Sequence, residues 1–296
     1  MSTQAWAELL VLGCIWGGVF LAARLALNEV GVITAVAHRT FWAALVLWTV
    51  VIAKGLTLPR SWRLWGVFMV MGLLNNLIPF ALLNWSQLYI ESGLTSIFNA
   101  TTAIFGVIAA AIFFADEKLS PRKILGVGFG FLGVATAIGL ENLTQFDLRS
   151  IAQLAAITAT ISYAFAAVWA RKHFSGQQPE IAAAGMLTCS AMIAIPAAIL
   201  VDGPISFDLA PVTVGALAYI SVIATACAYL LYYRVIRMAG IGNLSLVTLL
   251  IPPFAIGLGA LVLGETISSN AYTGFALLAL GLLILDGRIM TWFRSK

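Results

Sequence analysis

The chain has 296 residues, of which 61% are hydrophobic and only 9% are charged, and its mean hydropathy is +1.01. Soluble domains carry about 25% charged residues, so this composition excludes a soluble globular protein and indicates an integral membrane protein. The formal net charge of +4 does not indicate nucleic-acid binding, because in such a chain the information lies in how charge is distributed over the loops.

Ten apolar stretches follow one another along the chain. Each is about 18 to 26 residues long, enough for a helix to cross the roughly 30 Å of hydrocarbon in a bilayer. The alternating pattern of membrane β-strands is not seen. We therefore expect an all-α membrane protein with ten transmembrane helices. The expected spans are 6–27, 31–53, 65–90, 92–114, 123–140, 150–170, 180–201, 211–234, 239–263 and 270–287.

Lysine and arginine are distributed unevenly between the two membrane sides that these spans define. Thirteen lie at span ends and in loops on the side of the N-terminus, whereas the opposite side carries only Arg24 and Arg149, and Arg39 lies within a span. The side richer in basic residues is cytoplasmic under the positive-inside rule. We therefore expect a multi-pass protein with both termini in the cytoplasm.

The two halves of the chain carry similar sequences. Residues 262–287 read VLGETISSNAYTGFALLALGLLILDG, and 148 positions earlier the chain reads FADEKLSPRKILGVGFGFLGVATAIG, so Glu265 aligns with Glu117. The first spans of the halves also correspond, at an offset of 147, which pairs Trp16 with Tyr163. Two separate stretches that align in the same order predict a duplication. Both glutamates lie at helix ends, where we expect them to cap the N-termini of neighbouring helices.

Each half has five spans, and because five is an odd number, the second half enters the membrane from the side opposite to the first. The two repeats are therefore inverted relative to each other. We expect the halves to be residues 1–145 and 146–296. Inverted repeats are typical of secondary transporters, which bind substrate near the midplane where the halves meet. The predicted fold is therefore two inverted five-helix repeats around a central cavity.

Several motifs resemble a known family. The GE or DE that closes the fourth helix of each half, WGGVFLAARLAL at 16–27 and AVAHRTFWAALVL at 35–47 resemble the EamA repeat. The resemblance covers nearly the whole chain and implies a ten-helix exporter of the drug/metabolite transporter superfamily in a bacterial inner membrane. The length, aromatic content and short loops resemble the YddG-like branch, which exports aromatic and other neutral amino acids. The second half departs from the pattern, because Met186 and Leu187 align with Arg39 and Thr40.

Polar and aromatic residues in the middle of the spans are the candidates for the cavity wall, since polar groups in a bilayer face a cavity or another helix. Several of them form stripes at helical spacing. A hydroxyl can instead bond to its own helix backbone. The candidates are Trp16, His38, Arg39, Asn76, Phe80, Asn84, Trp85, Thr95, Asn99, Thr102, Ser162, Tyr163, Ser221, Thr225, Tyr229, Tyr232, Ser245 and Thr248.

Arg39 and His38 are the basic groups deepest in the spans. Arg39 could hold a substrate carboxylate, or it could tie helices together or extend toward the membrane surface. His38 could bind substrate or a proton. Pro79, Pro252 and Pro253 remove backbone donors inside helices, which predicts kinks next to the cavity.

The fifth and tenth helices have few polar side chains and carry glycines instead. Gly126, Gly130 and Gly133 lie in the fifth, and Gly274 and Gly281 lie in the tenth. Small residues let helices approach closely. We expect these helices at the back of the molecule, where they pack together or form a homodimer; the sequence leaves a monomer open.

The predicted function is transport of a small molecule across the bilayer, by alternating access and without a cofactor. No catalytic constellation or metal-ligand spacing is found, which disfavours an enzyme. Aromatic residues near mid-membrane together with Arg39 favour aromatic and other neutral amino acids as substrates. The alternatives are a multidrug or organic-cation exporter, or a nucleobase or metabolite permease. A cation exporter usually has an acid deep in a span, and none is found here.

Overall fold

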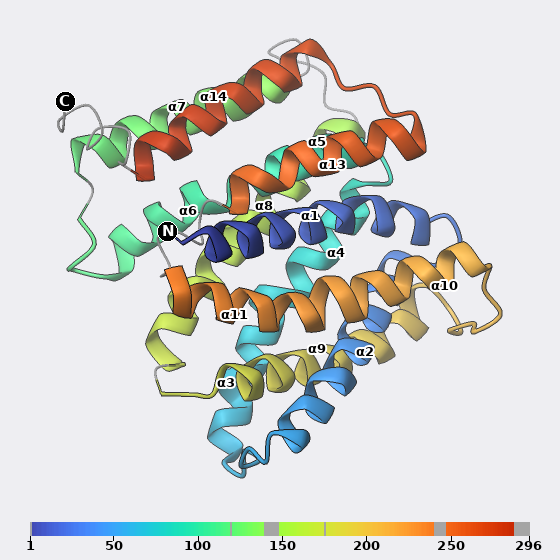
Figure 1. Cartoon of the computed structure of the whole chain (residues 1–296). Helices are drawn as coiled ribbons and strands as arrows, with labels where there is room; N and C mark the ends of the chain where they lie inside the picture. Colours follow the sequence, from blue (N-terminus) through green and yellow to red (C-terminus); the bar gives the residue numbers. More distant parts are fainter. Residues whose placement is uncertain (1, 119, 139–147, 175, 240–246, 287–296) are drawn as a thin grey trace.

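The computed structural model describes residues 2–118, 120–138, 148–174, 176–239 and 247–286, which form helices and no strands (Figure 1). The elements are α1 (Thr3–Ala26), α2 (Val32–Ala53), α3 (Trp62–Gly72), η1 (Leu73–Leu77), α4 (Ile78–Ser86), α5 (Ser92–Asn99), α6 (Thr102–Phe113), α7 (Pro121–Ile138), α8 (Leu148–His173), α9 (Pro179–Val201), α10 (Pro211–Ala218), η3 (Tyr219–Cys227), α11 (Ala228–Ala239), α13 (Val247–Leu263) and α14 (Ser269–Asp286).

These elements confirm the ten expected spans. Eight helical segments are long and apolar enough to cross a membrane, and two shorter apolar helices, Val247–Leu263 and Ser269–Leu285, follow them. The third span is α3, η1 and α4 in succession, and it ends at Ser86 rather than at residue 90. The first residues of α1 and the last residues of α14 point to the same side of the molecule, on the left in Figure 1. Ten crossings are an even number, which requires both ends of the chain to lie on the same side of the membrane.

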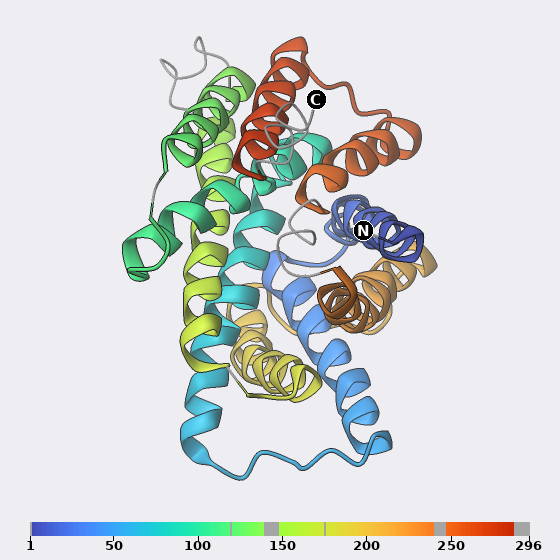
Figure 2. The ribbon, with the colours of Figure 1, turned by 60° about the vertical axis from the view of Figure 1, so that its left-hand side comes forward.

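Equivalent helices of the two halves pack in equivalent ways (Figure 2). The second helices, α2 and α9, pack against each other, as do the fifth helices, α7 and α14. The first helix of one half packs against the fourth of the other: α1 contacts α13, and α8 contacts α6. This reciprocal packing is the structural form of the inverted repeat.

Both halves widen into a π-helix in the middle of their third helix. At the offset of 147 that aligns the first spans, η3 overlays η1. In η1 the Ile78 N–H bonds to the Leu73 carbonyl, five residues earlier. The next residue, Pro79, has no N–H, so the Leu74 carbonyl lacks a backbone donor in this register. The Ser162 hydroxyl donates to it from α8 at 2.7 Å, which satisfies the carbonyl that the proline leaves free.

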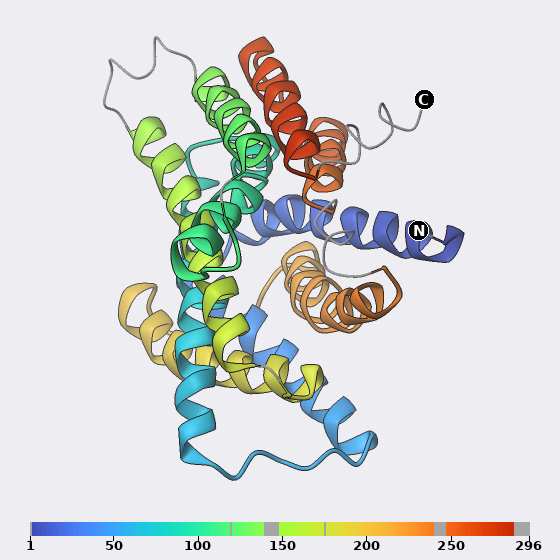
Figure 3. The same cartoon turned by 90° about the vertical axis from the view of Figure 1, so that its left-hand side faces the viewer.

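The fifth helices of the halves, α7 and α14, lie side by side (Figure 3), and their glycines lie at the contact. A Cβ atom on Gly133 would lie 2.6 Å from the Gly274 carbonyl oxygen, and one on Gly274 would lie 2.5 Å from the Gly133 carbonyl oxygen. Gly126 and Gly281 approach each other in the same manner. The close helix–helix approach predicted from these glycines therefore occurs within one chain, between α7 and α14. Neither helix reaches the central cavity.

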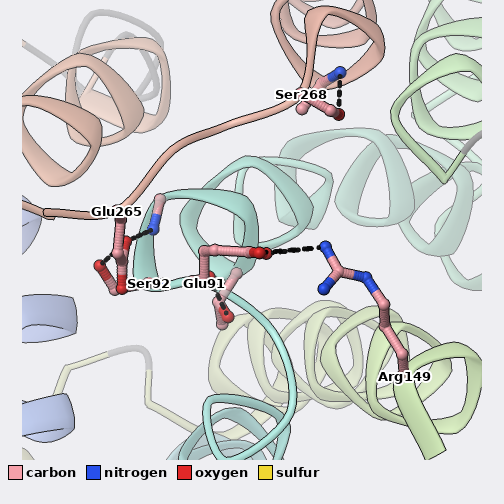
Figure 4. A network of polar contacts seen from close by, with 8 residues as sticks. Glu91, Ser92, Arg149, Glu265 and Ser268 are labelled. Atoms are coloured by element: carbon pink, nitrogen blue, oxygen red, sulfur yellow. Dashed lines mark hydrogen bonds and ion pairs between the residues drawn. The ribbon is translucent and has the colours of Figure 1, made fainter. Parts of the chain in front are cut away.

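A carboxylate from another segment holds the N-terminal end of α5 (Figure 4). Glu265, which follows α13, accepts hydrogen bonds from the Ser92 N–H at 2.9 Å, the Ser92 hydroxyl at 2.8 Å and the Gly93 N–H at 3.3 Å. Glu91 pairs with Arg149 of α8 at 2.9 Å. The Glu265 carboxylate satisfies free N–H groups and faces the positive end of the helix dipole. The cap expected of Glu265 is present, and it joins the two halves.

Glu117, the repeat counterpart of Glu265, has ion-pair partners instead. It lies 2.8 Å from the Lys123 ammonium and 3.5 Å from the Arg171 guanidinium. Arg171 also pairs with Asp116, and the hydrogen bond from this arginine lowers the pKa of the Asp116 carboxyl. Because Asp116 is exposed, this pair adds little to stability.

Candidate substrate cavity

A cavity of about 610 Å³ lies between the two halves. Its size is in the range of small-molecule binding sites. Among the described residues, the wall comes from every span except the fifth and tenth. Candidate residues that line it are Trp16, Arg39, Phe80, Asn84, Asn99, Thr102, Tyr163, Thr225, Tyr229, Tyr232 and Thr248.

Aromatic rings form much of this wall. Trp16 of α1 is anchored by its indole N–H, which donates to the Ala224 carbonyl of η3 at 3.2 Å. Its ring packs against Tyr232 of α11 with 5.8 Å between ring centroids. Tyr163, the repeat counterpart of Trp16, lines the same cavity from α8. Rings contributed by both halves suit a flat or apolar guest.

Arg39 is fixed in the wall by two contacts from opposite halves. Its Nε donates to the Thr225 hydroxyl of η3 at 2.9 Å. Its guanidinium carbon lies 3.6 Å from the centroid of the Phe80 ring of α4. None of the ion pairs found among the described residues includes Arg39. The described part of the cavity wall also contains no aspartate or glutamate, so Arg39 gives this site a positive potential.

An amide network supports the wall where η1 meets α9 and α11. Asn75 donates to the Tyr229 hydroxyl at 2.9 Å, and that hydroxyl donates to the side-chain amide oxygen of Asn76 at 3.4 Å. Asn76 donates in turn to the Ser190 hydroxyl at 3.1 Å. Asn75 and Tyr229 reach the cavity, whereas Asn76 is fully buried behind them. The structure thus places Asn76 as a support for the wall.

Three hydroxyl candidates do not line the cavity, and each donates to a backbone carbonyl. Thr95 donates to the Glu91 carbonyl of its own helix. Ser221 donates to the Leu217 carbonyl and to the His38 carbonyl. Ser162 donates to Leu74, as described above. The cavity-facing stripe of α8 is therefore Tyr163, Ala167 and Ala170.

His38 and Trp85 also lie away from the cavity wall. The His38 ring accepts a hydrogen bond from the Trp42 indole at 3.2 Å and meets the edge of Phe207 at 6.0 Å. Trp85 packs beside Tyr89, with ring centroids 5.0 Å apart. Ser245, the last candidate of this group, lies outside the described residues.

The prolines of the third and ninth spans lie beside the wall. Pro79 precedes cavity-lining Phe80, and its effect is the free Leu74 carbonyl described above. Pro252 and Pro253 lie inside α13, which continues through them to Leu263. Ile251, directly before them, lines the cavity. The kink in α13 remains a prediction.

The sequence reasoning missed several wall residues, including Phe20, Asn75 and Tyr233. Gln87, which shares a helical face with the candidate Phe80, lines the cavity as well. It lies seven residues after Phe80, two helical turns along the same face. Helical spacing did not predict Asn75 and Tyr233 as wall residues, because each lies directly next to a residue that already belonged to a stripe. Among the described residues, no group of three or more metal-ligating side chains is found.

Comparison with known proteins identifies one family. The model of the EamA-like transporter family matches residues 5–139 and 150–285. The uncharacterized transporter YoaV of Bacillus subtilis is 22% identical over 90% of this chain and 91% of its own length. A probable terminal-alkyne amino-acid exporter of Streptantibioticus cattleyicolor is 24% identical over 98% of this chain and 95% of its own length. One crystal structure superposes with a TM-score of 0.69 at 17% identity, covering 98% of this chain and 99% of the other.

Proposed function

The chain belongs to the EamA-like transporter family, and we propose that it exports aromatic and other neutral amino acids by alternating access. Membership of this family, together with the transporters among the relatives, makes the chain a membrane transporter. Its partners are the lipid bilayer and a small-molecule substrate. The amino-acid substrate is the proposal.

The observation that carries the proposal is the aromatic cavity between the repeats. Trp16 and Tyr163 are repeat counterparts in the first helix of each half, and both line this cavity. When two halves move about a shared site, counterpart rings can stay against one guest while access passes from one side to the other. One relative whose name describes an amino-acid exporter supports the substrate class.

An organic cation fits the cavity less well. Arg39 faces the cavity, and no carboxylate in the described part of its wall could neutralise a bound cation. A zwitterion has no net charge and presents a carboxylate to the arginine. The electrostatics therefore favour a neutral amino acid over a cationic drug.

The direct test is efflux from proteoliposomes loaded with one compound at a time. We expect phenylalanine, tryptophan and smaller neutral amino acids to leave the vesicles faster than from protein-free vesicles. Nucleobases and organic cations should leave at the protein-free rate. Export of an organic cation without any amino-acid flux would contradict the proposal.

A second expectation concerns orientation in a bacterial inner membrane, with both termini in the cytoplasm. Lys118 and Thr266 are exposed and follow the fourth span of the first and second half. In a background without the native cysteines, Lys118→Cys should react with a membrane-impermeant thiol reagent only from the cytoplasmic side. Thr266→Cys should react only from the outer side. Reaction of both from the same side would contradict the inverted arrangement.

A further inference from the structure

Two side chains on the cavity wall have bonding capacity that the described protein does not use. The Gln87 Oε1 atom is buried and has no hydrogen-bond partner, and the Gln87 side chain as a whole is 1% exposed. The Arg39 guanidinium uses its Nε on Thr225 and takes part in none of the described ion pairs. Buried polar groups are nearly always paired in native proteins. A hydrogen-bond acceptor without a donor and a cation without an ion-pair partner lie on the wall of one cavity. They therefore indicate a ligand that carries both a hydrogen-bond donor and an anionic group.

The chain geometry brings these two groups within reach of one small molecule. Arg39 lies against the Phe80 ring, and Gln87 follows Phe80 by seven residues on the same face, which separates their Cα atoms by roughly 10 Å. Side chains on a helix lean toward its N-terminus, so the Gln87 amide is directed back toward Phe80. Both side chains line the same cavity of about 610 Å³, so one α-amino acid inside it can present its carboxylate to Arg39 and its ammonium to Gln87.

The wall nearby has the same polarity. Asn84 lies between Phe80 and Gln87 on α4 and also lines the cavity. On α5, the Asn99 Oδ1 atom is a second buried acceptor that has no partner among the described residues, and Asn99 lines the cavity as well. These acceptors suit a cationic ammonium group. The Arg39 fork suits a carboxylate, which it can bind through two parallel N–H donors.

We propose that Arg39 and Gln87 form a subsite for the zwitterionic head group of an α-amino acid. Arg39 binds the carboxylate, and the Gln87 amide oxygen accepts a hydrogen bond from the ammonium. This inference rests on the proposed function and adds to it the residues that select the head group. It implies that compounds lacking either charge are poor ligands even when the ring is the same.

The test compares three ligands that share one aromatic ring: phenylalanine, phenylethylamine without the carboxylate, and 3-phenylpropionate without the ammonium. Binding to the purified full-length protein is measured by calorimetry, and transport by counterflow in proteoliposomes. We expect the wild-type protein to bind phenylalanine at least about tenfold more tightly than either truncated ligand, since each loses a hydrogen bond to a charged group. This comparison needs no variant.

Two variants assign the charges to residues. Arg39→Gln should weaken phenylalanine binding by about 30-fold or more and change phenylethylamine binding little. Gln87→Met keeps the length of the side chain but removes the acceptor; it should weaken phenylalanine about tenfold and leave 3-phenylpropionate unchanged. Arg63→Gln, at an exposed arginine, and Gln153→Met, at a buried glutamine outside the cavity wall, are the matched controls and should bind all three ligands as the wild type does.

The outcomes separate this inference from the proposed function. If the wild type transports phenylalanine but binds all three ligands equally, the subsite is wrong and the function stands. Equal losses for complete and truncated ligands in either variant would also overturn the subsite. If the wild type neither binds nor transports any amino acid, both proposals fail.

Discussion

Gly133→Val should separate α7 from α14 and lower the free energy of unfolding by about 3 kcal/mol, the upper end of the usual cost of overpacking. A Cβ atom at position 133 would lie 2.6 Å from the Gly274 carbonyl oxygen and 2.6 Å from the Leu278 nitrogen. Both are backbone atoms of a helix, which cannot rotate aside as a flexible side chain can. The helices must therefore move apart and lose contact along their whole length.

Gly128→Val is the matched control for this change. Gly128 lies in the same helix, but its Cβ position has no neighbouring atom within 4 Å. Because both variants introduce the same branched residue into one helix, the difference between them reports only the contact with α14. Denaturant titration of the two purified proteins in one detergent measures it. Equal stability of the two variants would mean that this glycine contact does not hold the fifth helices together.

The number of helices and their repeat could be predicted because both depend on patterns along the chain. Ten apolar stretches of sufficient length appear as ten spans, and Glu265 caps α5 as its place at a helix end suggested. The glycines of the fifth and tenth helices were recognisable because only a close approach explains glycine at regular spacing in lipid.

The internal irregularities of the helices could not be predicted. Pro79 indicated that a carbonyl would be free, but the π-helix before it also depends on tertiary packing. A Cβ atom on Gly72, next to η1, would lie 2.6 Å from the Met186 carbonyl oxygen of α9. The break between α5 and α6 likewise carries neither proline nor glycine. The close approach of Gly72 to α9 joins the two halves, and no local sequence pattern records it.

Polarity alone was a poor guide to which face of each helix lines the cavity. Ser162 was a reasonable candidate on the sixth span, yet its hydroxyl satisfies the Leu74 carbonyl, and Ala167 and Ala170 lie on the wall instead. A serine can bond to a nearby carbonyl, so its presence does not identify a wet face. Tyr163, which the repeat aligns with Trp16, lines the cavity as Trp16 does.

Trp16→Ala should weaken transport of phenylalanine and tryptophan by about tenfold or more while leaving threonine transport within about twofold. The Trp16 ring lines the cavity, and its hydrogen bond to Ala224 holds it in place against Tyr232. An aromatic guest loses both a buried surface and a ring contact, which contributes about 0.5–1.5 kcal/mol beyond burial. Threonine has no ring and loses neither.

Trp6→Ala is the matched control, because Trp6 lies ten residues earlier on the same helix and is 42% exposed. Both variants remove one indole from α1, so a general effect of tryptophan loss on membrane insertion would appear in both. Trp16→Phe adds a second comparison: it retains a ring but loses the bond to Ala224, and it should recover part of the phenylalanine transport. Initial efflux rates from proteoliposomes, normalised to the amount of inserted protein, give the selectivity directly. Equal losses for phenylalanine, tryptophan and threonine in Trp16→Ala would mean that Trp16 packs the interface between α1 and η3 and does not contact the guest.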